Sequence, residues 1–151
     1  MSGRMFDVAI AGGGLAGGLA ALALHRARPA LRLALVERGE ALGGNHRWSW
    51  FASDLSPAGA ALLAPLRTTR WGGYEVRFPG FARTLDTPYN SLASADFDQA
   101  LRRELPAGAI VTGRRIDALD ARGIDFEGGE RIEARAVIDA RGLEGAPHLE
   151  G

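Results

Sequence analysis

The hydrophobic pattern near the N-terminus predicts a strand, a helix and a second strand. Residues 5–10 are mostly apolar and stop at a cluster of glycines, as a buried strand does. From residue 15 to 28, leucines recur at helical spacing among small residues, and Pro29 ends the pattern. Residues 31–36 are apolar on both faces, which is typical of a parallel strand covered by helices. Together they predict a βαβ unit of about 30 residues.

The pattern loosens after this unit. Beyond Gly44 we expect a long ordered connection that contains neither a strand nor a helix of any length. Residues 74–78 alternate as a strand with one buried face, and Gly80 predicts a turn into a return strand at 83–85. This pair of strands is expected to belong to a second layer.

A second helix is expected at residues 96–105. Asp96 can cap it, Pro106 follows it, and apolar residues share a stripe at positions 97, 100, 101 and 105. Short strands should follow, and the last of them ends at a turn over residues 140–142. These strands are expected at 109–111, 115–119, 123–126, 131–132 and 136–139.

Composition excludes several classes of function. The 151 residues are 46% hydrophobic and 24% charged, as in an ordinary soluble domain. Eighteen basic side chains balance eighteen acidic ones, so the net charge does not indicate a nucleic-acid partner. The absence of cysteine excludes disulfides, thiolate metal ligands and cysteine nucleophiles, and no other metal site is indicated. The apolar stretch 8–24 is interrupted by glycines and falls short of the ~18 apolar residues of a spanning helix.

A glycine-rich turn between the first strand and the helix carries the clearest chemical signal. Residues 12–17, Gly-Gly-Gly-Leu-Ala-Gly, fit the G-x-G-x-x-G pattern in its expected strand-to-helix context. Gly12 permits a tight turn, Gly14 leaves room for a pyrophosphate, and Gly17 lets helix and strand approach closely. Leu15 and Ala16 begin the helix, whose unpaired N–H groups and partial positive charge would meet the phosphates. The segment predicts a dinucleotide-binding loop.

An acidic residue at the end of the second predicted strand fits the same function. Glu37 lies 20 residues after Gly17, where its carboxylate can accept hydrogen bonds from an adenosine ribose diol and disfavours a 2′-phosphate. The following residues favour FAD over NAD, because Arg38 precedes a loop in which Gly43 and Gly44 can lie close to the pyrophosphate. The alternative interpretation is a flexible surface turn beside an exposed glutamate.

The fold class follows from these elements and this motif. We predict an α/β, Rossmann-like FAD-binding domain with three layers, in which a parallel sheet is joined to a β-meander crossover. Residues 1–151 are assigned to this N-terminal domain. We expect it to be an incomplete part of a larger flavoprotein, because parallel strands need covering helices and the chain stops soon after one. About residues 68–95 we expect the start of an inserted β-layer of a substrate domain.

Four pieces of the sequence share the pattern of one known family: the GGNHRWSW segment at 43–50, Trp71 with 74–79, Tyr89 with Ser91, and 137–142. Through them the chain resembles the bacterial type of lycopene beta-cyclase from about residue 7 to residue 142. It departs from that family at Gly17-Gly18, where an asparagine is common, at Arg47 in place of threonine, and at Ala140 in place of glycine. None of these changes removes a group that we assign to catalysis.

The resemblance implies cyclisation of the linear ends of lycopene, or a related linear carotene, to beta-ionone rings. It implies reduced FAD as the cofactor, NADPH as the reductant and no net redox change, with acid–base and electrostatic chemistry on a carbocation. The family's acidic catalytic motif is expected beyond Gly151, so this chain alone is expected to be inactive and its catalytic residues stay unknown. The implied location is the cytoplasm, with peripheral association of the full-length enzyme at the inner membrane.

Four further residues are candidates for contact with FAD. Asp139 and Gly142 lie where the last strand ends, the edge at which doubly wound sheets face their ligand, although Asp139 is equally suited to a turn-forming cap. His46 is a candidate for contacting the flavin or orienting Asn45, whereas a lone histidine is more often structural. An aromatic cluster is a candidate wall of a polyene tunnel or ordinary core packing: Trp48, Trp50, Phe51, Trp71 and Tyr74.

Two other functions stay open at this point. One is a different FAD enzyme of the same fold, of the hydroxylase or carotene desaturase type. The other is a nucleotide-binding or partner-binding module without catalysis.

Overall fold

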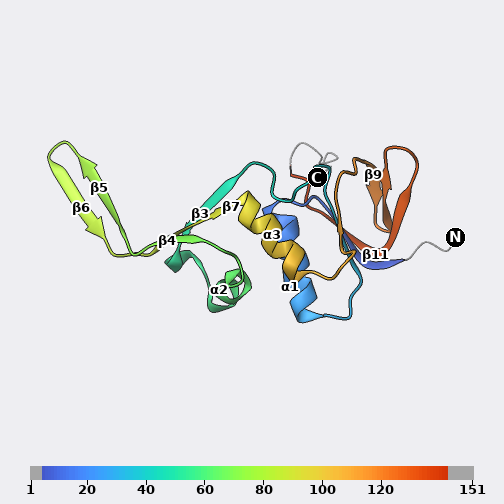
Figure 1. Ribbon diagram of the computed structural model, residues 1–151, viewed down its shortest axis with the longest axis horizontal. Coiled ribbons are helices and arrows are strands. Elements are labelled where there is room, and N and C mark those ends of the chain that lie inside the picture. Colours follow the sequence, from blue (N-terminus) through green and yellow to red (C-terminus); the bar gives the residue numbers. More distant parts are fainter. Residues whose placement is uncertain (1–4, 143–151) are drawn as a thin grey trace, which may run out of the picture.

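The fold is built on a six-stranded sheet in which four neighbouring strands are parallel. The computed structural model describes residues 5–142 and has this sheet at one end, with a smaller β-region at the other (Figure 1). The order is β8-β2-β1-β11-β10-β9, and β11, β10 and β9 form an antiparallel meander. The bounds are β1 Phe6–Ala11, β2 Leu33–Val36, β8 Ile110–Val111, β9 Ile116–Asp120, β10 Gly123–Phe126 and β11 Arg131–Asp139.

Strand β1 lies at the centre, between β2 and β11. Ile10 packs into the cluster beneath the helices, whereas Ala9 and Ala11 pack into the cluster beneath the meander, and none of the three is exposed. A strand buried on both faces needs apolar residues at successive positions, which is why residues 8–11 of β1 show no alternation after Asp7. The prediction of two buried parallel strands flanking a helix is confirmed.

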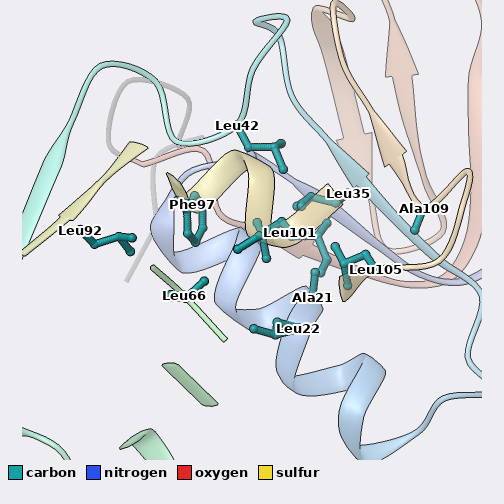
Figure 2. Close-up of a cluster of buried hydrophobic side chains, with 12 residues drawn as sticks. Ala21, Leu22, Leu35, Leu42, Leu66, Leu92, Phe97, Leu101, Leu105 and Ala109 are labelled. Carbon is teal, nitrogen blue, oxygen red and sulfur yellow. The ribbon is translucent and has the colours of Figure 1, made fainter. Parts of the chain in front are cut away.

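Two helices cover one face of the sheet. These are α1 (Leu15–Ala27) and α3 (Ser94–Glu104), and Figure 2 shows the buried side chains of α3 lying over α1 and the sheet. Gly18 allows this packing, because a Cβ there would meet the Phe97 ring and would lie 2.5 Å from a methyl group of Leu101. The buried cluster consists of Ile10, Ala21, Leu22, Leu35, Leu42, Leu66, Leu92, Phe97, Ala100, Leu101, Leu105 and Ala109.

The meander covers the opposite face and completes the third layer. Ile124 and Phe126 of β10 are buried against Ala34 and Val36 of β2, together with Ala134 of β11. Small residues in the parallel strands leave room for these larger meander side chains. The three-layer α/β prediction, with a parallel sheet and a β-meander, is therefore confirmed.

Two element boundaries differ from the sequence prediction. Helix α3 begins at Ser94, so Asp96 lies in the first turn and does not cap the helix. The Ser94 N–H donates to the His46 carbonyl oxygen at 3.1 Å, and this long-range bond starts the helix two residues early. The strands expected at 131–132 and 136–139 form one nine-residue strand, which pairs first with β10 and then with β1.

The expectation of an irregular connection beyond Gly44 is wrong. The segment contains strands that pair with partners some 40 residues away, a relation that local hydrophobic periodicity does not reveal. A three-stranded antiparallel sheet results, in the order β3-β7-β4. The elements are β3 Arg47–Phe51, the 3-10 turn Ala52–Asp54, α2 Pro57–Leu63, β4 Thr69–Trp71 and β7 Tyr89–Ala93.

The hairpin expected around Gly80 is confirmed. Strands β5 (Tyr74–Phe78) and β6 (Phe81–Leu85) pair antiparallel, and Gly80 takes the turn with φ of +77°. The two strands form a sheet of their own, and the hairpin projects at the far end of the molecule (Figure 1).

The interface between α3 and α1 yields a test of the core. Leu101→Ala should lower the free energy of unfolding by about 2–5 kcal/mol, because it removes a fully buried side chain between helix and sheet. Gln99→Ala, an exposed change on the same helix, should alter it by less than about 0.5 kcal/mol. Urea denaturation of both variants measures the difference, and equal stabilities would contradict this description of the core.

Candidate functional site

A cleft opens at the carboxyl ends of the parallel strands. Its volume is about 440 Å³, within the range of small-molecule sites. Strands β1, β2 and β11 all end at this edge of the sheet, and the loops that follow them form the walls. The lining residues are Gly12, Gly14, Val36, Glu37, Arg38, Gly43, Gly44, His46, Arg115, Ile116, Glu127, Ala140 and Arg141.

The first wall is the glycine-rich turn after β1. Gly12 has a φ of +106°, and a Cβ there would lie 2.6 Å from the carbonyl oxygen of Ala140. A Cβ at Gly17 would overlap the carbonyl oxygen of Gly12. Neither position has room for a side chain, so β1, β11 and α1 meet at backbone distance only because both residues are glycine.

Gly14 differs from its two neighbours in the motif. It precedes α1 as the N-cap, and a Cβ built on it meets no atom within 4 Å. The first helical hydrogen bond is donated by Gly18 to the Gly14 carbonyl oxygen at 2.9 Å, which leaves the N–H groups of Leu15, Ala16 and Gly17 before it. Within the part of the chain that the structure describes, no side chain caps this end and no acidic residue lies in its first turn. The open space and the helix end therefore suit an anionic group.

Glu37 follows β2 and is fixed by the backbone around it. Its Oε2 accepts from the Gly13 N–H at 2.9 Å and its Oε1 from the Gly39 N–H at 2.9 Å. Each carboxylate oxygen keeps a further lone pair that can accept from a hydroxyl group. The carboxylate is thus oriented before any ligand binds, which removes part of the entropic cost of binding.

The second glycine loop docks onto the first. The Gly43 N–H donates to the Gly13 carbonyl oxygen at 2.9 Å, and Gly43 and Gly44 have φ of +80° and +58°. A Cβ at Gly43 would lie 3.0 Å from the ring of Trp48 and 3.1 Å from that of Phe97. The loop can pass between the aromatic core and the cleft because it carries no side chain at this point.

The remaining predicted residues are divided between the cleft and its surroundings. His46 lines the cleft and is exposed, with its ring centroid 6.0 Å from that of Trp48. Asn45, Asp139 and Gly142 are exposed and do not line it. Asp139 accepts from the backbone N–H of Arg141 at 3.2 Å and from its guanidinium at 2.8 Å, which is the turn-forming interpretation of this residue.

Sequence reasoning missed six residues of the wall. One is Val36, the last residue of β2. Arg115 and Glu127 come from the meander and form an ion pair at 3.5 Å, and Ile116 lies beside them. Ala140 and Arg141 follow β11, next to the Asp139 that the motif indicated. No local signal marks the meander residues, because only the curl of β9 and β10 over the sheet brings them to the end of β2.

The predicted aromatic cluster is two separate groups. Trp48 and Trp50 pack against the helical core, with the Trp48 ring 5.2 Å from that of Phe97 in an edge-on arrangement. A row of rings lies elsewhere, on the three-stranded sheet and at the base of the β5–β6 hairpin, with centroid separations of 5.1 to 5.9 Å: Phe51, Trp71, Tyr74 and Tyr89. Neighbouring residues of a strand point to opposite faces, so Trp50 and Phe51 cannot share one wall.

The described residues include neither a cluster of metal ligands nor a membrane-spanning helix. Residues 5–142 contain no group of three or more His, Asp or Glu side chains arranged to hold a metal ion. None of the helices in that range has the length and apolar character needed to cross a membrane.

Comparison with known proteins assigns the chain to a family. A family model described as lycopene cyclase protein matches residues 7–150. The chain belongs to the lycopene cyclase family. The resemblance noted in the sequence is thereby confirmed.

Curated relatives of this lycopene cyclase family member carry the same family name. The lycopene beta-cyclase of Paracoccus sp. is 46% identical over 143 residues, covering 95% of this chain and 36% of the relative. The lycopene beta-cyclase of Pseudescherichia vulneris is 40% identical over 146 residues, covering 97% of this chain and 38% of the relative. The chain spans little more than a third of the length of the curated relatives it matches.

Solved structures share the fold at low sequence identity. The 2-methyl-3-hydroxypyridine-5-carboxylic acid oxygenase superposes with a TM-score of 0.67 at 22% identity, over 89% of this chain and 39% of that one. The 2,6-dihydroxypyridine-3-hydroxylase of Arthrobacter nicotinovorans gives 0.61 at 18% identity, over 90% and 37%. A protein described as an FAD-containing monooxygenase of Photorhabdus luminescens gives 0.55 at 18% identity, over 91% and 39%. These likenesses confirm the Rossmann-like fold.

The Asp139–Arg141 pair makes stability depend on pH. The Arg141 guanidinium bonded to Asp139 holds the pKa of that carboxyl below its usual value, so the pair stabilises the fold above pH ~4 and ceases to do so as pH falls further. Arg141→Gln should cost about 1 kcal/mol or less at pH 7, with the difference from wild type shrinking below pH 4. Urea denaturation between pH 3 and 7 measures this.

A matched control lies on the same strand. Arg135→Gln removes an exposed guanidinium 3.7 Å from Asp7, and its effect should be smaller at every pH. If the Arg141→Gln difference persisted unchanged at pH 3, the ionised Asp139 would not be its cause.

Proposed function

We propose that this chain is the FAD-binding part of a lycopene beta-cyclase. The observation that carries the proposal is the cleft between glycine loop, helix N-terminus and Glu37, in a chain that belongs to the lycopene cyclase family. The curated relatives are lycopene beta-cyclases, and the chain matches them over nearly all of its length. The activity is proposed for the complete gene product, because the relatives are much longer than this chain.

The residues of the cleft fit a dinucleotide. Gly14 leaves open space beside the free N–H groups of α1, which suits a pyrophosphate. The Glu37 carboxylate has the acceptor capacity and fixed position that an adenosine ribose diol requires. Arg38, Arg115 and Arg141 line the same cleft and can offset the phosphate charge.

FAD in its reduced form would supply negative charge beside a carbocation formed in the substrate, with NADPH as the reductant. The protein residues described above would hold and orient the cofactor. Loops 12–17 and 43–44 would let it approach the backbone, and the Glu37 carboxylate would hold its ribose. His46, exposed on the wall, is a candidate for orienting Asn45 or contacting the cofactor, and Asp139 and Gly142 stay candidates through the turn after β11.

The proposed substrate is lycopene or a related linear carotene. A proton added to a terminal double bond leaves a carbocation, the ring closes on it, and a proton is lost, so that atoms and charge balance with no net oxidation. We assign the proton donor to an acidic motif beyond Gly151. Residues 68–95, which include β4, β5, β6 and β7, are proposed to begin the β-layer of the substrate domain.

The proposed location is the cytoplasm, with the complete enzyme attached peripherally to the inner membrane. A linear carotene dissolves in lipid and not in water, so the enzyme must meet it at a membrane surface. Peripheral attachment satisfies this requirement without a spanning helix.

A second candidate is an FAD-dependent hydroxylase. The structural likeness to a pyridinecarboxylic acid oxygenase and a dihydroxypyridine hydroxylase favours it, although that likeness shows the fold alone. The two candidates differ in their use of oxygen, because a hydroxylase consumes oxygen and reductant with each turnover whereas a cyclase consumes neither in net terms.

The decisive experiment uses the complete gene product. An absorbance spectrum should show bound flavin, and anaerobic incubation with detergent-solubilised lycopene and a reductant should give products with beta-ionone rings. Flavin without cyclisation, but with oxygen consumed, would favour the hydroxylase. Absence of flavin after reconstitution would overturn the cofactor assignment.

Gly14 offers a test of the cofactor site alone. Gly14→Ala places a methyl group in the open space beside the α1 N-terminus, so FAD affinity should fall at least tenfold, while the less favourable N-cap residue should lower the unfolding free energy by only about 1 kcal/mol. Flavin fluorescence titration of the complete gene product measures the affinity. Gly72→Ala is the matched control, because Gly72 is also surrounded by open space but lies outside the cleft.

A further inference from the structure

One face of the β5–β6 hairpin has apolar pairs at its base and at its tip, and it is covered at the base and open at the tip. Cross-strand register pairs Tyr74 with Leu85 and Phe78 with Phe81, and alternation places both pairs on the same face, with Val76 and Arg83 between them. Tyr74 at the base is half-buried, with its ring 5.3 Å from that of Phe51. Phe78 and Phe81 at the tip are 65% and 54% exposed, more than any other large hydrophobic residue between positions 5 and 142.

The exposed rings contribute little to the folding of the described chain. The hairpin is a two-stranded sheet by itself, and Figure 1 shows its tip directed away from the rest of the molecule. Two-stranded hairpins are marginally stable in water, and a cross-strand pair of aromatic rings adds only about 0.2–1 kcal/mol to that stability. Paired rings at the end of a projecting hairpin are therefore a feature of a binding surface.

Positive charge borders the two rings. Arg77 and Arg83 flank the tip, and residues 76–85 contain no acidic side chain. Arg77 forms an exposed ion pair with Glu75 at 2.9 Å, whereas Arg83 forms no ion pair with another described residue. Phenylalanine rings beside guanidinium groups match the interface of a bilayer, where apolar side chains enter the boundary between headgroups and acyl chains and cations meet lipid phosphates.

We propose that the hairpin tip, residues 77–83, docks the protein on an anionic phospholipid bilayer. Phe78 and Phe81 enter the boundary between headgroups and acyl chains, and Arg77 and Arg83 contact the phosphates. The inference rests on the proposed function in one respect: a carotene substrate is dissolved in the bilayer, so the enzyme has to bind there to reach it.

The size of the apolar tip favours a bilayer over a protein partner. Two phenylalanine side chains bury about 300–500 Å² even when fully covered. A stable protein interface needs about 800 Å² from each partner. A bilayer accepts a small wedge, because acyl chains close around any shape and the arginines add electrostatic attraction.

Vesicle binding by the complete, FAD-loaded gene product tests the proposal. Wild type should sediment with vesicles of phosphatidylglycerol and phosphatidylethanolamine, and Phe78→Ser with Phe81→Ser should weaken binding at least tenfold. Arg77→Gln and Arg83→Gln should each weaken it about fivefold on these vesicles and leave binding to pure phosphatidylcholine unchanged. Met5→Ser, at an exposed apolar residue far from the hairpin, should bind as wild type.

A fluorescent variant reports insertion directly. Phe81→Trp should keep vesicle binding, and its emission, after subtraction of the wild-type spectrum, should shift to the blue and be quenched by brominated lipid. Failure of wild type to sediment, or equal binding by the double serine variant, would overturn the proposal. A change of oligomeric state in the double serine variant without a change in vesicle binding would also overturn it and show the tip to be a contact between copies.

Cyclisation assays separate this inference from the proposed function. The double serine variant should convert lycopene supplied in vesicles at least tenfold more slowly than wild type and lycopene in detergent micelles at the wild-type rate. If wild type cyclises lycopene from micelles but does not bind vesicles, the docking proposal fails and the function stands. If wild type binds vesicles through the tip but cyclises nothing, the function fails and the docking surface stands.

Discussion

The close approach of α1 to the end of β1 is the constraint on which the rest of the structure depends. The carbonyl oxygen of Gly12 occupies the space that a side chain at position 17 would need, and the Ala140 carbonyl oxygen occupies the space that a side chain at position 12 would need. Three backbones therefore meet where β1, β11 and α1 come together. Any larger residue would push the helix N-terminus away from the sheet and open the cleft at its closed end.

The same turn holds the other walls of the cleft through one peptide. The Gly13 N–H donates to Glu37 and the Gly13 carbonyl oxygen accepts from Gly43, so the loops after β1 and β2 are joined at a single residue. A side chain at position 13 would contact a methyl group of Leu42 at 2.5 Å and the Glu37 Cβ at 2.8 Å, so this position is restricted although the motif leaves it variable. Because the loop after β2 is fixed to the loop after β1 at two points, the cleft has its shape before any ligand binds, which favours binding.

Elements with local signals could be predicted from the sequence, and elements built by long-range pairing could not. The buried strands, the glycine turn and the stripe of α3 depend on residues near one another in the chain, and the structure has them within a few positions of the prediction. Strand β3 pairs with β7, which lies about 40 residues further along the chain. Its sequence, Arg-Trp-Ser-Trp-Phe, is not identified as a strand by hydrophobic periodicity. In the site, Gly12, Gly14 and Glu37 follow from a motif, whereas Arg115 and Glu127 reach the cleft through the curl of the meander.

Net charge is a poor guide to this protein, because its charges are not evenly distributed. Equal numbers of acidic and basic residues indicated no preference for an anionic partner. In the meander, Arg131 is paired with Asp120, Asp125 and Glu133 at 2.7 to 2.9 Å, so its charge is fully compensated where three strands turn over the sheet. At the hairpin the compensation is partial, since two arginines flank the tip and one carboxylate pairs with one of them.

The net charge of zero therefore hides a local excess of positive charge. Acidic side chains in the meander cancel, in the sum over the chain, positive charge that the far end of the molecule exposes. This local excess of positive charge attracts anionic surfaces, but the attraction is screened within about 10 Å at ordinary ionic strength. The charge therefore acts only where a projecting element brings it close to the surface.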